Sequence, residues 1–273
     1  MHLAWFARTV VLGALLGVLG PAQTSTSSVP AGVMRPPVGA RFDYQIGGAY
    51  RPGDAVRIVD RDRTAHPAGG RYNICYINAF QTQPQEKRWW RTHHPRLLLR
   101  TASGRVVIDR SWGEILLDTS TPRKRTALAR IVGRWVDGCA RRGFKGIEFD
   151  NLDSYTRSHR LLTAADAIAY ARLLTKRAHS DHVAAAQKNA AELSHRRTRA
   201  GFDFAIAEEC QVYSECGSYT RAYGRHVIEI EYTDDPLRYF RTACAARGDR
   251  ISVELVDRDV LPRAAAGHVR RWC

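Results

Sequence analysis

Short apolar runs alternate with longer segments of helical periodicity from residue 42 to the C-terminus. Apolar runs of this length predict buried strands, and the longer periodic segments predict amphipathic helices. The eight strand candidates are residues 55–60, 72–78, 115–118, 146–150, 183–187, 203–207, 227–231 and 251–256. Helical patterns between them include residues 126–141, 163–179 and 236–247. Residues 42–46 add an extra N-terminal strand. Eight strands with intervening helices predict an α/β fold of the (β/α)8 TIM-barrel type, with an open doubly wound sheet as the main alternative.

Acidic residues lie within or directly after several of these strands. The fourth predicted strand alternates apolar and acidic residues, so Glu148 and Asp150 point to the same face. The seventh repeats the pattern with Glu229 and Glu231, and Glu208 follows the sixth. Buried carboxylates are costly unless they are paired or used chemically. We therefore expect either buried ion pairs, which remain open for Glu148 and Glu229, or carboxylate-based catalysis.

Polar side chains end seven of the eight predicted strands. Barrel enzymes build their active sites at the carboxyl ends of the strands, where such side chains meet. The sequence therefore predicts that these strand-end residues converge at one mouth of the barrel. They are Asp60, Tyr76, Asn78, Asp118, Asp150, Asn151, Lys188, Asn189, Glu208, Glu209, Glu231 and Tyr232.

The N-terminal residues have the composition of an export signal. Arg8, an apolar run and small residues near Ala22 predict a signal peptide over residues 1–22, and a retained membrane anchor is the alternative. Residues 23–40 are rich in Ser, Thr, Pro and Gly and predict a flexible linker. Residues 41–273 then form a single domain. We expect a secreted monomer that is not attached to a membrane once the signal has been cleaved.

Six cysteines in an exported chain favour disulfides over metal binding. We predict that Cys210 pairs with Cys216 and that Cys244 pairs with Cys273. Cys75 and Cys139 then remain, and a buried free thiol at Cys75 is an equal alternative to their pairing. The sequence contains no CxxC, HExxH or EF-hand pattern, so we expect neither a metal nor another cofactor.

The formal net charge of +15 is compatible with an anionic partner, but its arginines are scattered along the chain. We therefore interpret the charge as a solvated surface and predict no nucleic-acid partner. A serine hydrolase lacks support because no GxSxG nucleophile motif occurs. A two-metal nuclease lacks support because the usual His/Asp clusters are missing.

The order of several short motifs resembles glycoside hydrolase family 114, a family of secreted (β/α)8 endo-α-1,4-polygalactosaminidases. The most specific motifs are Asp150-Asn151-x-Asp153 and Glu208-x-Cys210-x-x-Tyr213-x-Glu215-Cys216, and the resemblance extends over about residues 42–261. It implies that Asp150 and Glu208 are the catalytic carboxylates. Glu209 stands where the family usually has Gln, and Tyr44 where it usually has Trp. We predict further substrate contacts from Asp60, Tyr76, Asp118, Asn151, Asp153, Lys188, Asn189, Glu231 and Tyr232.

Glycosidic cleavage requires two carboxyl groups in different protonation states. We assign Asp150 as nucleophile, because Lys188 follows the neighbouring strand, and Glu208 as acid/base; the reverse assignment remains open. The predicted function is a secreted glycoside hydrolase that cleaves α-1,4-linked galactosamine- or N-acetylgalactosamine-containing polysaccharide. The alternative is a non-catalytic, secreted carbohydrate- or polyanion-binding protein on a barrel scaffold.

Overall fold

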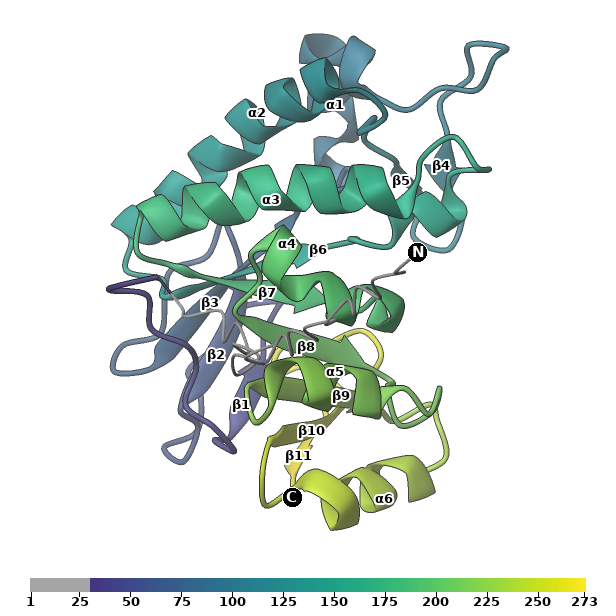
Figure 1. Ribbon diagram of the computed structural model, residues 1–273. Coiled ribbons are helices and arrows are strands. Elements are labelled where there is room, and N and C mark those ends of the chain that lie inside the picture. The colour runs from purple at the N-terminus through teal and green to yellow at the C-terminus, as the bar shows by residue number, and fades with distance from the viewer. Residues whose placement is uncertain (1–29) are drawn as a thin grey trace, which may run out of the picture.

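Eight parallel strands form the centre of the protein, whose computed structural model describes residues 30–273 (Figure 1). They follow one another around the sheet in sequence order, as in a (β/α)8 barrel. The strands are β1 (Phe42–Tyr44), β2 (Ile58–Asp62), β3 (Tyr72–Asn78), β6 (Gly146–Asp150), β7 (Ala184–Lys188), β8 (Phe204–Glu208), β9 (Val227–Tyr232) and β10 (Ser252–Val256). A ninth strand, β11 (Arg270–Trp272), pairs antiparallel with β10. The predicted barrel fold is thus confirmed.

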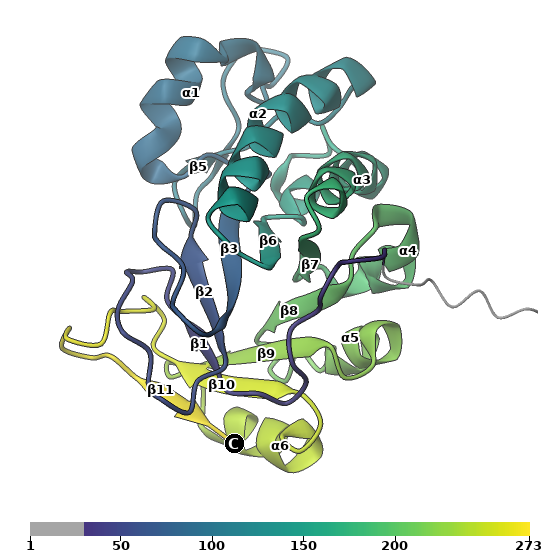
Figure 2. The same cartoon turned by 90° about the vertical axis from the view of Figure 1, so that its left-hand side faces the viewer.

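Helices cover the outer face of the strands from β3 to β10 (Figures 1 and 2). The α-helices are α1 (Lys87–His93), α2 (Pro122–Arg141), α3 (Ala164–Ser180), α4 (Arg197–Ala200), α5 (Cys216–Tyr223) and α6 (Arg238–Arg247). The short 3-10 helices are η1 (Pro84–Glu86), η2 (Pro95–Leu97), η3 (Ser154–Arg157) and η4 (Ala191–Arg196). A capping box formed by Thr163 and Asp166 begins α3. The connections between β1, β2 and β3 contain no helix, so loop residues such as Val56 and Ala68 cover the sheet there.

The prediction that residues 115–118 form a strand of the barrel was wrong. β4 (Ile108–Asp109) and β5 (Glu114–Ile115) form a separate antiparallel pair in the long connection between β3 and α2. We call this connection the β4–β5 excursion. The apolar run is buried there, because Leu117 belongs to the helix-side core and bridges to Leu98. Burial in an excursion leaves the same apolar pattern as burial in a sheet. The predicted N-terminal strand exists as β1 and is the first of the eight parallel strands.

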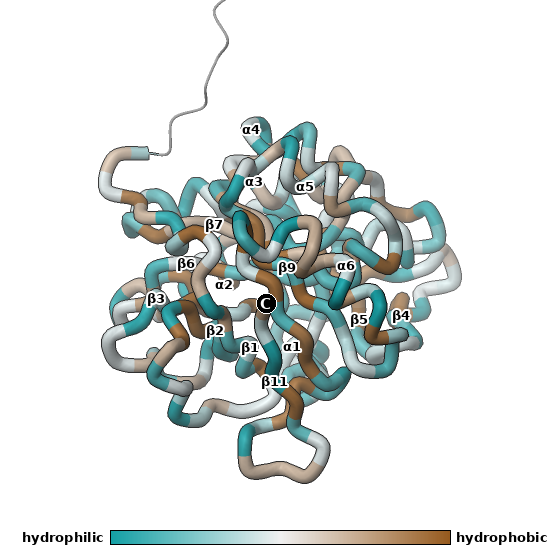
Figure 3. Tube along the Cα trace, turned by 90° about the horizontal axis from the view of Figure 1, so that it is seen from below, coloured by the Kyte–Doolittle hydropathy of each residue, from teal (hydrophilic) through white to brown (hydrophobic). Residues whose placement is uncertain are grey.

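Two apolar layers result from the period-two alternation along the strands. One layer lies between the sheet and the helices and includes Ile147, Phe149 and Leu174. The other fills the barrel interior and includes Phe42, Tyr44, Ile58, Ile74, Ala184, Ala186, Phe204, Ile206, Ile228, Ile230, Tyr232 and Val256. In Figure 3 hydrophobic positions lie along strands near the middle of the view, with hydrophilic positions spread over the surrounding helices and loops. The barrel interior is therefore a packed core and not a channel.

Side chains, rather than a backbone ladder, close the seam between β1 and β10. The N–H of Tyr44 donates to Glu254 Oε2 over 3.3 Å. From β11, Trp272 donates to the carbonyl oxygen of Phe42 and Arg270 donates to that of Tyr44. Figure 2 shows β11 beside β10 at this side of the barrel. The C-terminal strand therefore satisfies backbone groups that a hydrogen-bonded neighbour would otherwise pair.

The described residues contain three disulfides and no free cysteine. They join Cys75 to Cys139, Cys210 to Cys216, and Cys244 to Cys273, so both predicted pairs are confirmed. The open question at Cys75 is resolved in favour of pairing, which ties β3 to α2. The last disulfide ties the end of the chain to α6, next to the seam.

The predicted signal peptide, residues 1–22, lies outside the described residues. Of the predicted linker, residues 23–40, the first part up to residue 29 also lies outside them. Residues 30–40 run without regular secondary structure along the end of the barrel where its strands begin. Tyr72, the first residue of β3, donates its hydroxyl hydrogen to the carbonyl oxygen of Met34 over 2.8 Å. In the part of the chain that is described, no helix is both long and apolar enough to span a bilayer.

Candidate active site

A pocket of about 580 Å3 opens at the carboxyl ends of the barrel strands. Its walls come from the loops after β1, β6, β7, β8 and β10 and from the β4–β5 excursion. The lining residues that matter below are Tyr44, Tyr76, Trp112, Glu114, Asp150, Asn151, Asp153, Arg157, Lys188, Asn189, Glu208, Glu209, Tyr213, Tyr232, Arg258 and Asp259. Of the predicted strand-end residues, most therefore meet at this mouth.

Two carboxyl groups and one ammonium group form the floor of the pocket. Asp150, Lys188 and Glu208 are the last residues of β6, β7 and β8, three neighbouring strands. Lys188 Nζ lies 3.4 Å from Asp150 Oδ1 and 3.3 Å from Glu208 Oε2. The Lys188 side chain is 2 % exposed, whereas those of Asp150 and Glu208 are 18 % and 20 % exposed. The two carboxyl groups thus reach the solvent of the pocket while one buried cation bridges them.

Further hydrogen bonds orient each carboxyl group. Tyr76 donates to Asp150 Oδ2 over 2.6 Å. Tyr232 donates to Glu208 Oε1, and Asn189 Nδ2 donates to Glu208 Oε2 over 2.9 Å. The N–H of Glu208 donates in turn to Asn189 Oδ1 over 2.9 Å. These contacts hold both groups in fixed directions before a substrate arrives.

The residue after each of the three strand-end groups has a left-handed backbone. The φ angles are 65° at Asn151, 48° at Asn189 and 55° at Glu209. The chain therefore turns away sharply after each strand, and the preceding side chain points toward the mouth. Asn tolerates this conformation better than most residues. At Glu209, a 2.7 Å ion pair with Arg258 holds the side chain in place.

Burial and neighbouring charges shift the pKa values of several groups in and below the pocket. Burial disfavours the ammonium of Lys188, but the carboxylates around it raise its pKa well above the ordinary value. Burial, and then the charge of Asp150, raise the pKa of Tyr76. Burial and the charge of Glu208 do the same for Tyr232. Lys188 therefore remains charged, and both tyrosines remain hydrogen-bond donors at neutral pH.

The pocket is more acidic than the rest of the protein. Its lining includes six carboxyl groups against three cationic side chains, Arg157, Lys188 and Arg258. A smaller adjoining pocket of about 240 Å3 adds Glu192 and Glu215 and no cation. Exposed aromatic side chains flank the cleft, since Trp112 is 62 % and Tyr213 66 % exposed. Aromatic faces of this kind can stack on the apolar faces of sugar rings.

Three predicted site residues do not line the pocket. Asp60 points into the barrel but is fully buried below the floor. Asp118 accepts hydrogen bonds from Ser120 and pairs with Lys124 at the start of α2. Glu231 points outward, opposite to Tyr232, because consecutive strand residues alternate between faces. Burial raises the pKa of Glu231 to about 8, and its Oε1 accepts the N–H of Gln211.

Sequence reasoning missed Glu114, which the β4–β5 excursion brings to the pocket together with Trp112, a candidate for stacking on sugar rings. Glu114 is 7 % exposed, and Asn78 donates to its Oε2 over 2.8 Å. Burial raises the pKa of Glu114 to about 7. No periodicity identifies this residue, because its strand has only two residues outside the main sheet. Glu148 and Glu229 form the buried ion pairs that were left open, with Lys188 and Arg247 respectively.

Residues 30–273 contain one grouping of three possible metal ligands, namely Cys210, Cys216 and Glu229. The two cysteines are joined in a disulfide, and Glu229 pairs with Arg247 over 2.7 Å. This grouping therefore offers no free thiolate for a metal.

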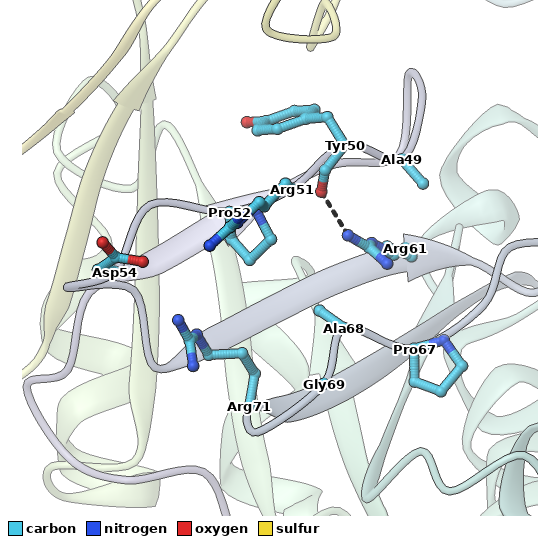
Figure 4. Close-up of a pocket in the computed structure, with 10 residues that line it drawn as sticks. All are labelled: Ala49, Tyr50, Arg51, Pro52, Asp54, Arg61, Pro67, Ala68, Gly69 and Arg71. Atoms are coloured by element: carbon cyan, nitrogen blue, oxygen red, sulfur yellow. Dashed lines mark hydrogen bonds between the residues drawn. The ribbon is translucent and has the colours of Figure 1, made fainter.

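A second cavity, of about 490 Å3, lies between the loops that precede β2 and β3 (Figure 4). It is lined by Arg51, Arg61 and Arg71, with Asp54 as its only carboxylate. Arg61 is committed to the fold, because it donates to the carbonyl oxygens of Tyr50 and His66. A single carboxylate does not supply the acid and base that hydrolysis of a glycosidic bond needs, so we place the active site at the barrel mouth.

A parallel barrel with two carboxyl groups at neighbouring strand ends and aromatic side chains along the cleft has the groups that glycosidic hydrolysis requires. The model of glycoside-hydrolase family GH114 matches residues 22–273, and the chain belongs to this family. The resemblance noted in the sequence is thus confirmed, and the protein is a glycosidase.

Solved structures agree with this fold. The crystal structure of Aspergillus fumigatus Ega3 in complex with galactosamine superposes with a TM-score of 0.71 at 20% sequence identity, covering 88% of this chain and 97% of that chain. The glycoside hydrolase domain of PelA from Pseudomonas aeruginosa gives a TM-score of 0.54 at 15% identity, covering 84% and 97%. No curated protein sequence matches the chain.

Proposed function

We propose that this protein is a secreted enzyme that cleaves α-1,4-linked galactosamine- or N-acetylgalactosamine-containing polysaccharide. The observation that carries the proposal is the carboxyl pair Asp150 and Glu208 in an acidic cleft, bridged by Lys188. Family membership supports glycosidic chemistry, and the galactosamine bound by the structural relative Ega3 supports the sugar class.

We assign Asp150 as nucleophile and Glu208 as acid/base. In the first step Asp150 attacks the anomeric carbon while Glu208 gives its proton to the leaving glycosidic oxygen. In the second step a water gives a proton back to Glu208 and displaces Asp150 from the sugar. Both groups lie within 3.4 Å of Lys188 Nζ, so their nearer oxygens are no more than about 6.7 Å apart, which favours the shorter spacing of retaining enzymes.

The charge of the cleft supports a cationic sugar in spite of the formal net charge of +15. Deacetylated galactosamine carries an ammonium group, which the scattered surface arginines repel only weakly beyond a Debye length of about 8 Å. Inside the cleft the nearest charges are mostly carboxylates. The cleft therefore reverses the field of the whole protein where the substrate binds.

Three disulfides support secretion, because disulfides persist in oxidising compartments outside the cytoplasm. The predicted signal peptide over residues 1–22 is part of the same proposal, as is the monomeric state. N-terminal sequencing of the exported protein tests it, and we expect the mature chain to begin near Gln23.

The activity is tested with purified protein and polymers of one linkage but different charge: α-1,4-polygalactosamine, its N-acetylated form and anionic polygalacturonate. We expect new reducing ends from the galactosamine polymers, fastest from the deacetylated one, and none from polygalacturonate. The anomeric form of the first product, followed by NMR, should be the α form of a retaining enzyme.

Matched variants connect the activity to the two carboxyl groups. Asp150→Asn and Glu208→Gln preserve side-chain size, and each should lower kcat by about a thousandfold or more. Asp249→Asn makes the same chemical change at a side chain that is 81 % exposed, and should leave kcat unchanged. Cleavage by the Glu208→Gln protein at the wild-type rate would rule out Glu208 as the acid/base and make Glu114 the next candidate for that role.

A further inference from the structure

A buried layer directly below the catalytic pair holds Lys188 from inside the barrel. Lys188 Nζ lies 2.6 Å from Glu148 Oε1 and 3.0 Å from the Tyr44 hydroxyl. Tyr44 donates its own hydrogen to the same Glu148 oxygen over 3.0 Å. Glu148 and Tyr44 are both fully buried. The position of the ammonium between the catalytic carboxyl groups is therefore fixed largely by two fully buried side chains.

Asp60 is the unexplained member of this layer. It faces the interior from β2 and is fully buried, and its carboxyl group lies close to that of Glu148. Among the described residues, no side-chain donor reaches either oxygen of Asp60 or Oε2 of Glu148. Two neighbouring buried carboxyl groups without a side-chain donor can satisfy each other by a hydrogen bond, which needs a proton on one of them. One of the two must therefore be protonated.

The charges around the pair decide which group holds the proton. Glu148 Oε1 accepts a hydrogen bond from the ammonium of Lys188, so this ion pair favours the negative charge on Glu148. Burial, and then the charge of Glu148, raise the pKa of Asp60 well above its ordinary value. Two ionised carboxylates side by side in a dry interior would be far more costly than one.

We propose that Asp60 is a positioning residue that keeps its proton and donates it to Glu148. Glu148 then presents one oriented negative charge to Lys188. The ammonium in turn stays within reach of both Asp150 and Glu208, and its charge is balanced from below. The inference rests on the proposed roles of these two carboxyl groups, and it adds a buried, proton-carrying support to them.

The charge balance involves every strand that faces this layer. The titratable groups are Tyr44 on β1, Tyr76 on β3, Glu148 and Asp150 on β6, Lys188 on β7, Glu208 on β8, Tyr232 on β9 and Glu254 on β10. Glu254 lies at the seam, near Arg270. Arg258 covers the ring of Tyr232 at the mouth of the barrel, and Lys188 is the cation that contacts the carboxyl groups of the layer itself. An ionised Asp60 would therefore add a negative charge that nothing balances.

Two substitutions of similar size separate the proton from the hydrogen bond. Asp60→Asn removes the titratable proton but retains an N–H donor for Glu148, so no charge changes if Asp60 is neutral. Asp60→Leu removes the donor, which makes Glu148 easier to protonate. The charge of Lys188 is then less balanced and favours the ionised forms of the catalytic carboxyl groups, so both limbs of the pH–rate profile move to lower pH.

The test compares wild type, Asp60→Asn and Asp60→Leu by their pH–rate profiles on a galactosamine polymer. Asp60→Asn should retain kcat and the wild-type profile. Asp60→Leu should lower kcat by about tenfold, leave KM nearly unchanged and lower the pH optimum by about one unit. Asp203→Asn, a buried carboxyl-to-amide change just before β8, is the matched control and should leave the profile unchanged.

The infrared difference spectrum of Asp60→Asn against wild type at neutral pH measures the proton directly. We expect the loss of one protonated-carboxyl band, which the Asp203→Asn control should retain. Retention of that band in Asp60→Asn, or an acid shift of its pH profile, would show that Asp60 is ionised and overturn the proposal. Wild-type kcat and profile in Asp60→Leu would also overturn it. If Asp60→Leu does not fold, Asp60→Asn and the infrared band still decide.

Failure of the proposed function gives a different result. A protein that cleaves no galactosamine polymer would refute that function, whereas the infrared band would still report whether Asp60 carries the proton.

Discussion

Tyr232, the last residue of β9, donates its hydroxyl hydrogen to Oε1 of Glu208, the last residue of β8. The guanidinium of Arg258 covers the ring of Tyr232 at 3.9 Å from the ring centre. The neighbouring strand thus orients the proposed acid/base through a side chain that is itself held in place. The carboxyl group of Glu208 is therefore fixed from two sides, because Asn189 holds its other oxygen.

Loss of this hydrogen bond should slow the reaction without weakening substrate binding. A hydrogen bond to a charged group contributes about 1.5–3 kcal/mol, so Tyr232→Phe should lower kcat by roughly tenfold to a hundredfold with little change in KM. Steady-state kinetics on a galactosamine polymer measures this. Tyr239→Phe, on α6 and away from the pocket, is the control and should match wild type. An unchanged kcat in Tyr232→Phe would show that the contact does not assist catalysis.

Removal of Arg247 should destabilise the fold strongly. Its guanidinium lies 2.7 Å from Glu229 Oε1, and Glu229 is fully buried between β9 and α6. Arg247→Met leaves a buried charge without a partner and should lower the free energy of unfolding by about 3–5 kcal/mol. The double variant Glu229→Gln/Arg247→Met should recover most of that loss. Denaturant unfolding measures both, with the 61 % exposed Arg250→Met as a control that changes little.

Glu231 should make stability depend on pH near neutrality. Its pKa is about 8 in the folded protein, against an ordinary value of 4.5. Between these two pH values the folded state holds the proton that the unfolded state has released, so the free energy of unfolding falls as pH rises through this window. Glu231→Gln removes this dependence. Relative to wild type it should gain on the order of 2 kcal/mol between about pH 5 and about pH 8. A pH-independent difference in urea unfolding between the two proteins would contradict the burial of an acid here.

The three disulfides should differ in the stability that their removal costs. They close segments with sequence separations of 64, 29 and 6 residues. In the chain-entropy model, longer loops restrict the unfolded chain more. Paired Cys→Ser changes should therefore cost about 4 kcal/mol at Cys75–Cys139, somewhat less at Cys244–Cys273 and about 2 kcal/mol at Cys210–Cys216. Denaturant unfolding of the three double variants gives the order. Equal losses at all three would show that native packing outweighs loop length.

The sequence by itself determined the main strands and the identity of the central groups of the site. Asp150, Lys188 and Glu208 directly follow or end apolar runs, and neighbouring parallel strands that are consecutive in sequence bring their ends together. The cysteine pairs could also be proposed from an oxidising compartment and short separations. These features depend on local pattern and chain order, which are fully written in the sequence.

Only the tertiary structure decided which face of a strand meets the pocket. The period of two places Glu229 with Glu231 and Glu148 with Asp150, but it does not say which pair faces inward. The barrel turns Asp150 toward its mouth and Glu231 toward the helices. The sequence also left open how far each polar residue lies from the end of its strand. In the structure β2 continues to Asp62, and Asp60 lies buried below the floor of the pocket.

The β4–β5 excursion was the largest departure from sequence-based expectation. Its apolar run is as buried as a barrel strand, and this apolar pattern led to the wrong prediction of a barrel strand at residues 115–118. The same excursion brings Glu114 and Trp112 to the cleft. The apolar pattern of a segment indicates how much of its surface is buried away from water. Which residues lie next to that segment in space depends on long-range packing that no local pattern encodes.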